Sequence, residues 1–366
     1  MIEKEEGLKR TKSLQEFFKL ILRVVNVIIV VVTIIAYCGK NQDPSKFNVL
    51  YFLSLILPAL FFINIFSIIL KMILRRKISF FLLVQFIVII VLGKDLIGIN
   101  LKKEEQDNGL KIISYNVRGF NFFTKNINSI YSIKNEIDKL NPDFICMQEY
   151  LYFTDTAKIN FYNLIRDEYP YYFISKTKSY NAYNGLAIFS KYEIINEDEL
   201  YYKDKPFAQF LDVVVNNDTL GLINTHLHST YFNQISQNYI NSDLLFNSNS
   251  KKIIETSFGE LIENVKIRTS QIENIKNKIQ KKKDSYILCG DFNESNFTYN
   301  YTLLKGDLCD SFQESGLGYS STYKGLMNIF CTDYILYTNR IESLQYNSPN
   351  LNFSDHNPVI MSFIIK

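Results

Sequence analysis

Apolar residues fill three long runs near the start of the 366-residue chain, at about 17–37, 49–70 and 78–93. The first two are long enough for helices that cross a hydrocarbon core of about 30 Å, and the third reaches this length only if it extends to Ile99. One such run alone also fits a buried core helix. Three in succession, separated by short charged links, predict a bundle of three transmembrane helices in residues 1–100.

The basic residues beside these runs predict an orientation in the membrane. They stand before or at the start of the first run, and again between the second and third: Lys4, Lys9, Arg10, Lys12 and Lys19, then Lys71, Arg75, Arg76 and Lys77. The first connecting loop offers only Lys40 and Lys46. Because basic loops stay in the cytoplasm, the N-terminus is expected inside. Three crossings then place the chain after about residue 100 outside, whereas two crossings would leave residues after 100 inside. Arg23 interrupts the first run and a small-residue cleavage site is lacking, which argues against a removable signal peptide.

After a linker at 101–109, short apolar runs alternate with helical patterns through residues 110–366. The runs predict strands at 110–116, 143–149, 185–190, 210–215, 220–226, 285–291, 332–337 and 358–365. Apolar residues at helical spacing predict a helix that ends at Asn141-Pro142 and a second one at 260–280. Several strands follow each other directly, so two packed sheets flanked by helices are expected. The Asn- and Ser-rich segment 229–258 is expected to run over the surface.

Composition narrows the classes of function. The net charge of +3 gives no strongly basic surface for nucleic acid, so any phosphate-binding site has to be local. The five cysteines are scattered without a CxxC or Cys/His spacing, which argues against a zinc site and a disulfide framework. A bridge between Cys309 and Cys331 is the alternative to free buried thiols.

Polar residues recur where the predicted strands end. They are Asn116, Glu149, His226, Asp291 with Asn293, and Asp355 with His356. Any one of them alone reads as a turn residue or a helix cap. Their recurrence at successive strand ends, which are rigid platforms beside open space, indicates a site.

The residue types at these ends point to phosphate chemistry. Glu149 and Asp355 with the amide of Asn116 form an all-oxygen set that suits Mg²⁺, with Mn²⁺ as the alternative. All three histidines of the chain lie beside predicted strand ends: His226, His228 and His356. Imidazoles near a hard cation suit a phosphoryl group, whose charge has to be neutralised.

With these residues in hand, the chain resembles the endonuclease/exonuclease/phosphatase superfamily. The family's motifs occur in order as "SYNVRGF" (114–120), "DFICMQE" (143–149), "NGLAIFSKY" (184–192), "NTHLHS" (224–229), "GDFNES" (290–295), "TDYIL" (332–336) and "SDHNPV" (354–359). The resemblance covers about residues 110–366 and extends to a bacterial membrane-anchored subgroup. It implies a four-layer α/β sandwich of two packed mixed sheets flanked by helices, with the site at one rim of the sheets.

The resemblance also implies roles for individual residues. Glu149 is the principal magnesium ligand, with Asn116 and Asp355 assisting. Asp291 orients or deprotonates the attacking water, and Asn293 holds that water or a phosphate oxygen. His356 contacts the phosphate, and Asp333 fixes its tautomer. His226 lies near the phosphate and the leaving group and completes the catalytic set. His228 is a structural neighbour.

Two arginines are candidates for contacts to the substrate phosphate. Arg118 follows the first strand, and a surface ion pair is the alternative. Arg268 belongs to an Arg-x-x-Gln pair with Gln271 that the bacterial subgroup carries before "GDFN", and a snorkelling structural role is the alternative. The stretch 330–332 reads Phe-Cys-Thr where related bacterial sequences often carry an arginine, which puts a local ion pair in doubt.

The expected function is a magnesium-dependent phosphoesterase in the bacterial inner membrane, multi-pass, with the catalytic domain outside the cytoplasm. Its substrate is a nucleic acid or a lipid head group, and the membrane anchor favours the second. The run Lys281–Lys283 mildly favours anionic partners, although a solvated helix end is the commoner meaning. The alternative outside the enzymes is a non-catalytic binding or scaffold protein with the same fold. An obligate protein partner is not indicated.

Overall fold

A computed structural model describes residues 2–73, 80–100, 109–124, 128–154, 159–175, 178–179, 182–229, 250–280, 285–325 and 329–366. The chain forms two compact units, Met1–Leu96 and Ile97–Lys366. Three features that the sequence singled out lie wholly or mostly outside the described residues: the basic residues Arg75–Lys77, the linker 101–109 and the run Lys281–Lys283. Most of the segment 229–258 does so as well, because its description resumes only at the helix that begins at Ser250.

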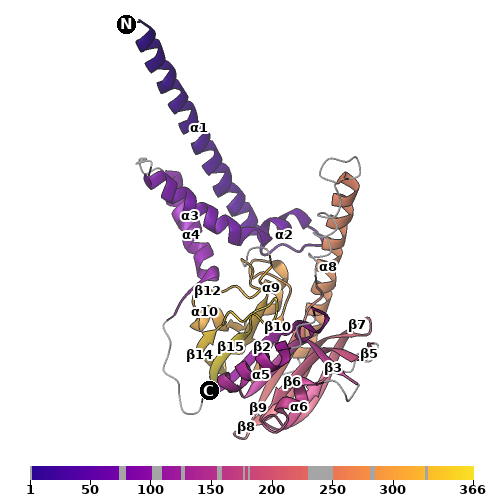
Figure 1. The fold of residues 1–366 in the computed structure, drawn as a ribbon. Coiled ribbons are helices and arrows are strands. Elements are labelled where there is room, and N and C mark those ends of the chain that lie inside the picture. The colour runs from indigo at the N-terminus through magenta and orange to yellow at the C-terminus, as the bar shows by residue number, and fades with distance from the viewer. Residues whose placement is uncertain are drawn as a thin grey trace. The chain divides into compact units, whose positions relative to one another are not determined.

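The first unit consists of helices α1 (Ile2–Gly39), α2 (Asn48–Leu55), α3 (Leu57–Ile73) and α4 (Phe80–Leu96) (Figure 1). Within the described residues, only the stretch Glu16–Gly39 of α1 is by itself long and apolar enough to cross a membrane. The α2–α3 pair passes the same test only if it is counted as one span, and it is bent by 56°.

The expectation of three transmembrane helices is therefore corrected to one, or to two with the bent pair. A break at Ile56 divides the second apolar run, and Pro58 lies just after it in the first turn of α3. Helix α4 has 17 residues. At 1.5 Å per residue it is about 25 Å long, which is short of the roughly 30 Å of a hydrocarbon core.

Polar side chains of the first unit lie between its helices. The Asn64 Nδ2 donates to Thr33 Oγ1 of α1 at 2.9 Å, and the Gln85 Nε2 of α4 donates to Asn64 Oδ1 at 3.0 Å. The Ser67 hydroxyl of α3 donates to Asn26 Oδ1 of α1 at 2.6 Å. Large apolar side chains of α1, α3 and α4 are exposed instead: among them are Ile28, Phe66, Ile69, Phe86 and Ile90. The unit thus buries several polar side chains among apolar ones, while many of its large apolar side chains are exposed.

The second unit is built on two mixed sheets. The larger has the order β14-β15-β2-β3-β6-β4, with β5 also paired to β6. Its strands are β2 (Leu110–Asn116), β3 (Phe144–Phe153), β4 (Tyr171–Ile174), β5 (Lys178–Ser179), β6 (Ala182–Ser190), β14 (Ile341–Asn347) and β15 (Val359–Ile365). Strands β2 and β3 run parallel, while the other neighbours are antiparallel.

The second sheet has six strands in the order β11-β13-β10-β9-β8-β7. They are β7 (Ile194–Tyr202), β8 (Lys205–Val215), β9 (Asp218–His226), β10 (Ser285–Asp291), β11 (Cys309–Asp310) and β13 (Asp333–Tyr337). Only β9 and β10 are parallel. All eight predicted strands occur in the two sheets with small shifts of their ends, so the predicted pair of packed mixed sheets is confirmed.

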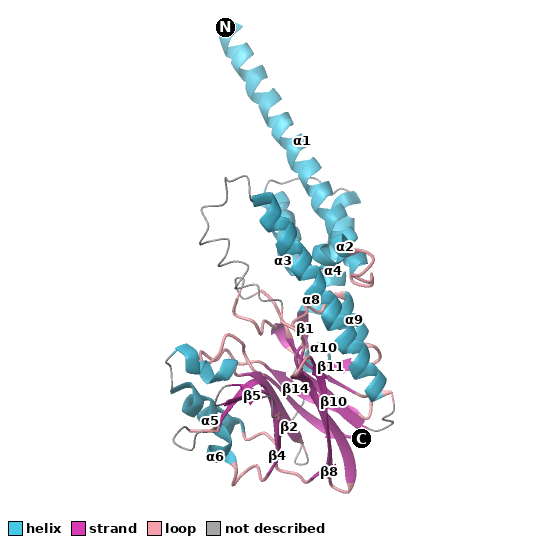
Figure 2. Ribbon diagram, turned by 90° about the vertical axis from the view of Figure 1, so that its right-hand side faces the viewer, coloured by secondary structure: helices cyan, strands magenta, loops and turns pink. Residues whose placement is uncertain are grey.

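Helices cover the outer faces of both sheets (Figure 2). Helices α5 (Asn128–Leu140) and α6 (Phe161–Ile165) pack on the larger sheet, and α8 (Ser250–Ile279) and α9 (Tyr299–Lys305) pack on the smaller one. Apolar residues of both sheets, with Leu222 and Met361 among them, bury the core between the sheets. The other helices in the described part of this unit are the short α10 (Ser311–Ser315) and the 3-10 segment η1 (Arg118–Thr124).

A small ribbon precedes the larger sheet in the chain. Strand β1 (Ile97–Ile99) pairs antiparallel with β12 (Leu317–Tyr319), and the Asn100 backbone N–H donates to the Gly316 carbonyl at 3.1 Å. The second unit therefore begins at Ile97, before the residues that the sequence indicated as a linker. The five cysteines are free thiols, Cys309 and Cys331 included.

Candidate active site

Two side chains of the larger sheet open the site, at the ends of the parallel strands β2 and β3. Asn116 is the last residue of β2 and is fully buried. Glu149 lies at an irregularity of β3 between Met147 and Tyr150, with φ at +50°. A bulge of this kind redirects a side chain out of the normal alternation. The Asn116 Nδ2 donates to Glu149 Oε1 at 3.1 Å.

Three strands of the smaller sheet contribute the facing side. The register places His226 of β9 and Asp333 of β13 on either side of Asp291, the last residue of β10. Gly290 makes this close approach feasible, because its φ is +142° and a Cβ there would lie 1.8 Å from the Thr225 carbonyl oxygen. The strand ends thus bring an imidazole and two carboxylates side by side.

The two sheets meet at Asp291. Its Oδ2 accepts a hydrogen bond from Asn116 Nδ2 at 3.0 Å, which joins the sheets across the core. The His226 Nε2 lies 3.7 Å from the same Asp291 oxygen and 3.9 Å from Glu149 Oε1. Residues more than 170 positions apart in the sequence therefore share one rim of the sandwich.

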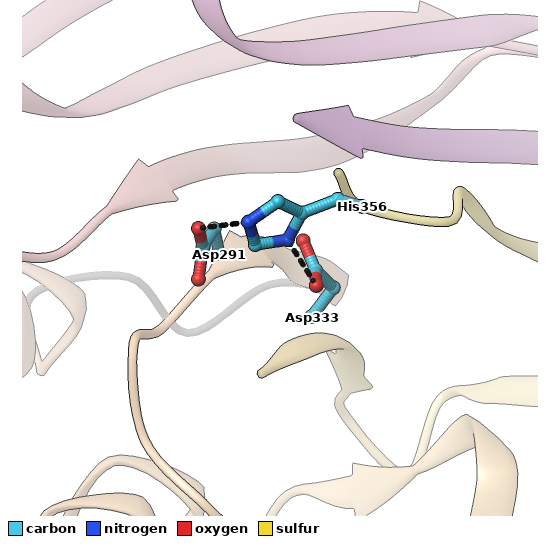
Figure 3. Close-up of side chains that lie close together, drawn as sticks. All are labelled: Asp291, Asp333 and His356. Carbon is cyan, nitrogen blue, oxygen red and sulfur yellow. Dashed lines mark hydrogen bonds and ion pairs between the residues drawn. The ribbon is translucent and has the colours of Figure 1, made fainter. Parts of the chain in front are cut away.

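His356 lies between two buried carboxylates (Figure 3). Its Nδ1 is 2.9 Å from Asp333 Oδ2, and its Nε2 is 3.7 Å from Asp291 Oδ2. Burial alone would lower the pKa of His356, but the charges of Asp333 and Asp291 outweigh it and raise the pKa to about 10. The imidazole is thus positively charged at neutral pH. Burial and the charge of Asp333 raise the pKa of Asp291.

The segment before β15 docks onto the end of β2. The Ser354 hydroxyl donates to the Asn116 carbonyl oxygen at 2.7 Å. Asp355 is half-buried, and its Oδ2 lies 3.3 Å from the Nε of Arg118, whose backbone N–H donates to Asn116 Oδ1 at 3.0 Å. Arg118 is exposed and thus makes the ion pair that was the alternative to a phosphate contact, beside the other site residues.

Asn293 completes the group on the segment after β10. Its backbone N–H donates to Asp291 Oδ1 at 2.9 Å, and its Nδ2 donates to the Leu227 carbonyl at 3.0 Å. Its φ is +50°, in the left-handed region that asparagine tolerates better than most residues. The carboxamide is therefore tied to the segment that follows His226.

Arg268 lies apart from this group. Its side chain is 2% exposed, its Nε donates to Glu294 Oε1 at 2.7 Å and its Nη1 donates to the His228 carbonyl at 2.9 Å. The burial rules out snorkelling, which requires the charged end in solvent. His228 also contacts α8, with its Nε2 3.1 Å from Asn264 Oδ1.

The donor groups fit a divalent cation. Glu149 offers an anionic oxygen at the rim, as Mg²⁺ prefers. Asn116 directs its Nδ2 to Glu149 and Asp291, and its Oδ1 accepts from the Arg118 N–H, so its amide would have to turn to give an oxygen to the cation. Ligand atoms of Asp291, Asp333 and His356 lie within 4.8 Å of one another. The Asp333 Oδ1 is buried and has no hydrogen-bond partner among the residues that the structure describes.

The sequence reasoning missed several residues around the site. Tyr323 packs its ring against His356, with 5.1 Å between the ring centres. The Thr322 hydroxyl accepts from the backbone N–H of Asp333 at 3.1 Å, and the Thr332 hydroxyl donates to Asp333 Oδ2 at 2.9 Å. Thr332 thus contacts the aspartate in the stretch where an arginine was noted as lacking. The polar side chain of Thr332, next to an acid at a strand end, was the only signal in the sequence.

A buried amide pair under the site was also missed. The Gln148 Nε2 of β3 donates to Asn224 Oδ1 of β9 at 2.7 Å, and both residues are fully buried. Gln148 precedes Glu149, and Asn224 lies two residues before His226. Amides inside otherwise apolar strands were the available signal.

Comparisons with known proteins agree with this architecture. Residues 113–356 match the Endonuclease/Exonuclease/phosphatase family, and residues 19–94 match a domain of unknown function, DUF8431. No curated protein matches the chain. Among solved structures, the endonuclease/exonuclease/phosphatase from Beutenbergia cavernae has a TM-score of 0.51 at 14% identity, covering 70% of this chain and 72% of that one.

Two further structures give the same result. The human Nocturnin catalytic domain with bound sulfate anion has a TM-score of 0.50 at 18% identity, covering 73% of this chain and 96% of that one. A family protein from Leptotrichia buccalis has a TM-score of 0.50 at 17% identity, covering 70% and 100%. At these identities the likeness shows the fold, whereas the family match extends over most of the second unit. The chain belongs to the endonuclease/exonuclease/phosphatase family.

Proposed function

We propose that this protein is a Mg²⁺-dependent phosphoesterase that hydrolyses phosphodiester or phosphomonoester bonds by in-line attack of water. One observation carries the proposal: side chains from both sheets converge at a single rim, where Asn116 contacts Asp291 and Glu149 while His356 lies between Asp333 and Asp291. Hydrolysis of a phosphate ester needs a positioned nucleophile and charge neutralisation, and this set supplies groups for both.

Glu149 would be the principal ligand of the cation, with Asn116 and Asp355 assisting. Glu149 is partly exposed and is oriented by the Asn116 amide, so its carboxylate remains open to a ligand. Mg²⁺ at this rim would neutralise charge on the phosphate and on the leaving oxygen. Mn²⁺ fits the same oxygen donors.

The remaining residues handle the water and the phosphate. Asp291 would orient the attacking water or accept its proton, and Asn293 would hold that water or a phosphate oxygen. His356 is charged at neutral pH because its pKa lies near 10. Its imidazolium would therefore bind the phosphate and stabilise the pentavalent transition state, while Asp333 holds the ring through Nδ1. His226, whose Nε2 lies 3.7 Å from Asp291 Oδ2, would lie near the phosphate and the leaving group.

We further propose that the first unit anchors the enzyme in the bacterial inner membrane. The support is the many large apolar side chains that α1, α3 and α4 expose, together with the polar contacts between these helices, since soluble domains rarely expose such apolar surfaces. Helix α1 would cross the bilayer, with α3 bonded to it through Asn64 and α4 bonded to α3 through Gln85. A second crossing by the bent α2–α3 pair would put the second unit inside, whereas a single crossing by α1 from a cytoplasmic N-terminus would put it outside. An alkaline phosphatase fusion after Lys103 should then be active, and an inactive fusion would contradict this topology.

The substrate is a phosphate ester that the rim can reach, and membrane anchoring favours a lipid head group over extracytoplasmic DNA or RNA. The test uses the full-length protein in liposomes with sphingomyelin, plasmid DNA, RNA and bis(p-nitrophenyl) phosphate, each with Mg²⁺ or with chelator. Asp291→Ala and His356→Ala should each lower turnover by at least about 10³-fold. The surface variant Asp138→Ala, on α5, should retain it.

The outcomes of this assay distinguish a lipid phosphoesterase, a nuclease and a non-catalytic scaffold. Mg²⁺-dependent turnover that both variants lose establishes the enzyme, and the preferred substrate decides between lipid and nucleic acid. Turnover that persists in His356→Ala and Asp291→Ala would place the chemistry elsewhere. No turnover of any of the four substrates would favour a non-catalytic scaffold on the same fold.

A further inference from the structure

Helix α8 presents a row of polar side chains to the segments that follow β9 and β10. Asn264, Arg268 and Gln271 are four and three residues apart, so they lie on one face of the helix. That face contacts the segment after His226 directly. It also contacts the segment after Asp291 through the carboxylate of Glu294.

The first of these contacts fixes the backbone of His228. Its N–H donates to Gln271 Oε1 at 2.8 Å, and its carbonyl accepts from Arg268 Nη1 at 2.9 Å. Both hydrogen-bonding groups of one peptide segment are therefore bound to the helix. His228 lies only two residues after His226, so fixing its backbone also restricts the position of the His226 imidazole.

The second contact is a buried ion pair. The Arg268 Nε donates to Glu294 Oε1 at 2.7 Å, and the side chains are 2% and 0% exposed. The same carboxylate oxygen accepts from Asn300 Nδ2 at 2.7 Å, and the Glu294 carbonyl accepts from the Tyr334 hydroxyl at 3.1 Å. Glu294 is adjacent to Asn293, so this network holds the second segment next to the site.

The two segments are also bonded to each other. The Leu227 N–H donates to the Asp291 carbonyl at 3.0 Å, and Asn293 Nδ2 donates back to the Leu227 carbonyl at 3.0 Å. Arg268 therefore closes a ring: one guanidinium binds the outer end of each segment, and the segments bind each other at the inner end.

We propose that Arg268 is a positioning residue that sets the spacing between His226 and the Asp291–Asn293 pair. A buried ion pair is a poor source of stability, because apolar residues of similar size often stabilise as much. What this pair offers is a fixed geometry, since the planar guanidinium directs Nε and Nη1 to two different partners and a lysine amine lacks that fork. The inference rests on the proposed hydrolysis. It replaces the contact with phosphate that the sequence indicated for Arg268.

The experiment compares the full-length protein in detergent with the double variant Arg268→Met/Glu294→Met, which removes both charges together. Arg268→Lys keeps the charge without the fork. Ile275→Ala, a buried apolar position on the same helix, is the control for lost stability alone. Hydrolysis of bis(p-nitrophenyl) phosphate is measured well below the melting temperature of each variant. Hydrogen exchange is followed in peptides that contain Leu227 and Asn293.

The double variant should lose kcat by about 10- to 100-fold with KM little changed, as expected for displaced reacting groups. Arg268→Lys should lose about tenfold. The Leu227 and Asn293 amides should exchange faster in the double variant and keep the wild-type rate in Ile275→Ala. Wild-type kcat in the double variant, or an equal loss in Ile275→Ala, would overturn the proposal. Lost kcat with unchanged exchange would do so too, since Arg268 would then act on the substrate. If the wild type hydrolyses nothing, the exchange rates alone decide.

Discussion

Raising the pH from 6 to 9 is expected to weaken the second unit through the imidazole of His356. This group has an ordinary pKa of 6.5 and a pKa of about 10 in the folded protein, because Asp333 and Asp291 outweigh the effect of its burial. Between these values the folded state binds more protons than the unfolded state. The free energy of unfolding therefore falls as the pH rises through this window, and the contribution is complete only below pH 6.5.

The magnitude follows from the two pKa values. At about 1.4 kcal/mol per pKa unit, the full contribution is on the order of 5 kcal/mol, of which about 3 kcal/mol is lost between pH 6 and 9. Asp291 acts with the same sign, since its raised pKa means that stability falls as the pH rises, in a window that begins at 3.8. Comparing the wild type with a variant that lacks His356 separates the contribution of the imidazole from that of Asp291.

The assay is pulse proteolysis of the full-length protein in detergent micelles with chelator, over a series of urea concentrations at each pH. Wild type should lose about 3 kcal/mol across the range relative to His356→Asn. Asp333→Asn should reduce the loss, because the imidazole then lacks its nearest carboxylate. Parallel curves for wild type and His356→Asn, or a stability that rises with pH, would refute the reasoning.

Three further predictions concern the surroundings of the site. Gln148→Ala and Asn224→Ala should each cost about 2 kcal/mol of unfolding free energy and the double variant less than the sum, because each single change removes one hydrogen-bond partner of the other buried amide. Additive costs in urea denaturation would contradict this. Gly290→Ala should cost at least about 3 kcal/mol, since its methyl group would collide with the Thr225 carbonyl, and a fall of only a few degrees in melting temperature would show that the strands can separate there. Glu149→Gln should raise the Mg²⁺ concentration for half-maximal hydrolysis more than about tenfold, and an unchanged activity titration would place the cation elsewhere.

The convergence of the site could be predicted because it depends on strand ends. Apolar runs fixed the bounds of β2, β9 and β10 closely, and polar residues at those ends had to collect at the rims of the sheets. Strand β7 was not predicted, because it is an edge strand whose residues are mostly exposed and partly acidic. It lacks a buried face that would produce an alternation of apolar and polar residues. The bulge that turns Glu149 toward Asn116 escaped as well, since nothing in the local sequence marks it.

Two other features depended on tertiary contacts that sequence patterns do not contain. Arg268 occupies an apolar stripe, and its buried partner Glu294 lies 26 residues further along the chain, so that the pairing became visible only with both segments in place. In the first unit, hydropathy alone ran the second apolar stretch through Ile56 without a break. The break there sets α2 and α3, which both contact α1, at 56° to each other.

The β1–β12 ribbon bears on how the protein would respond to cutting. A protease that cleaves between Asn100 and Gly109 severs the chain after the second unit has already begun, so β1 would stay paired with β12 while attached to the other fragment. The two fragments would then copurify until a denaturant separates the ribbon. By the same logic, a recombinant fragment of the second unit needs to start no later than Ile97, because a later start leaves the backbone of β12 without its partner strand.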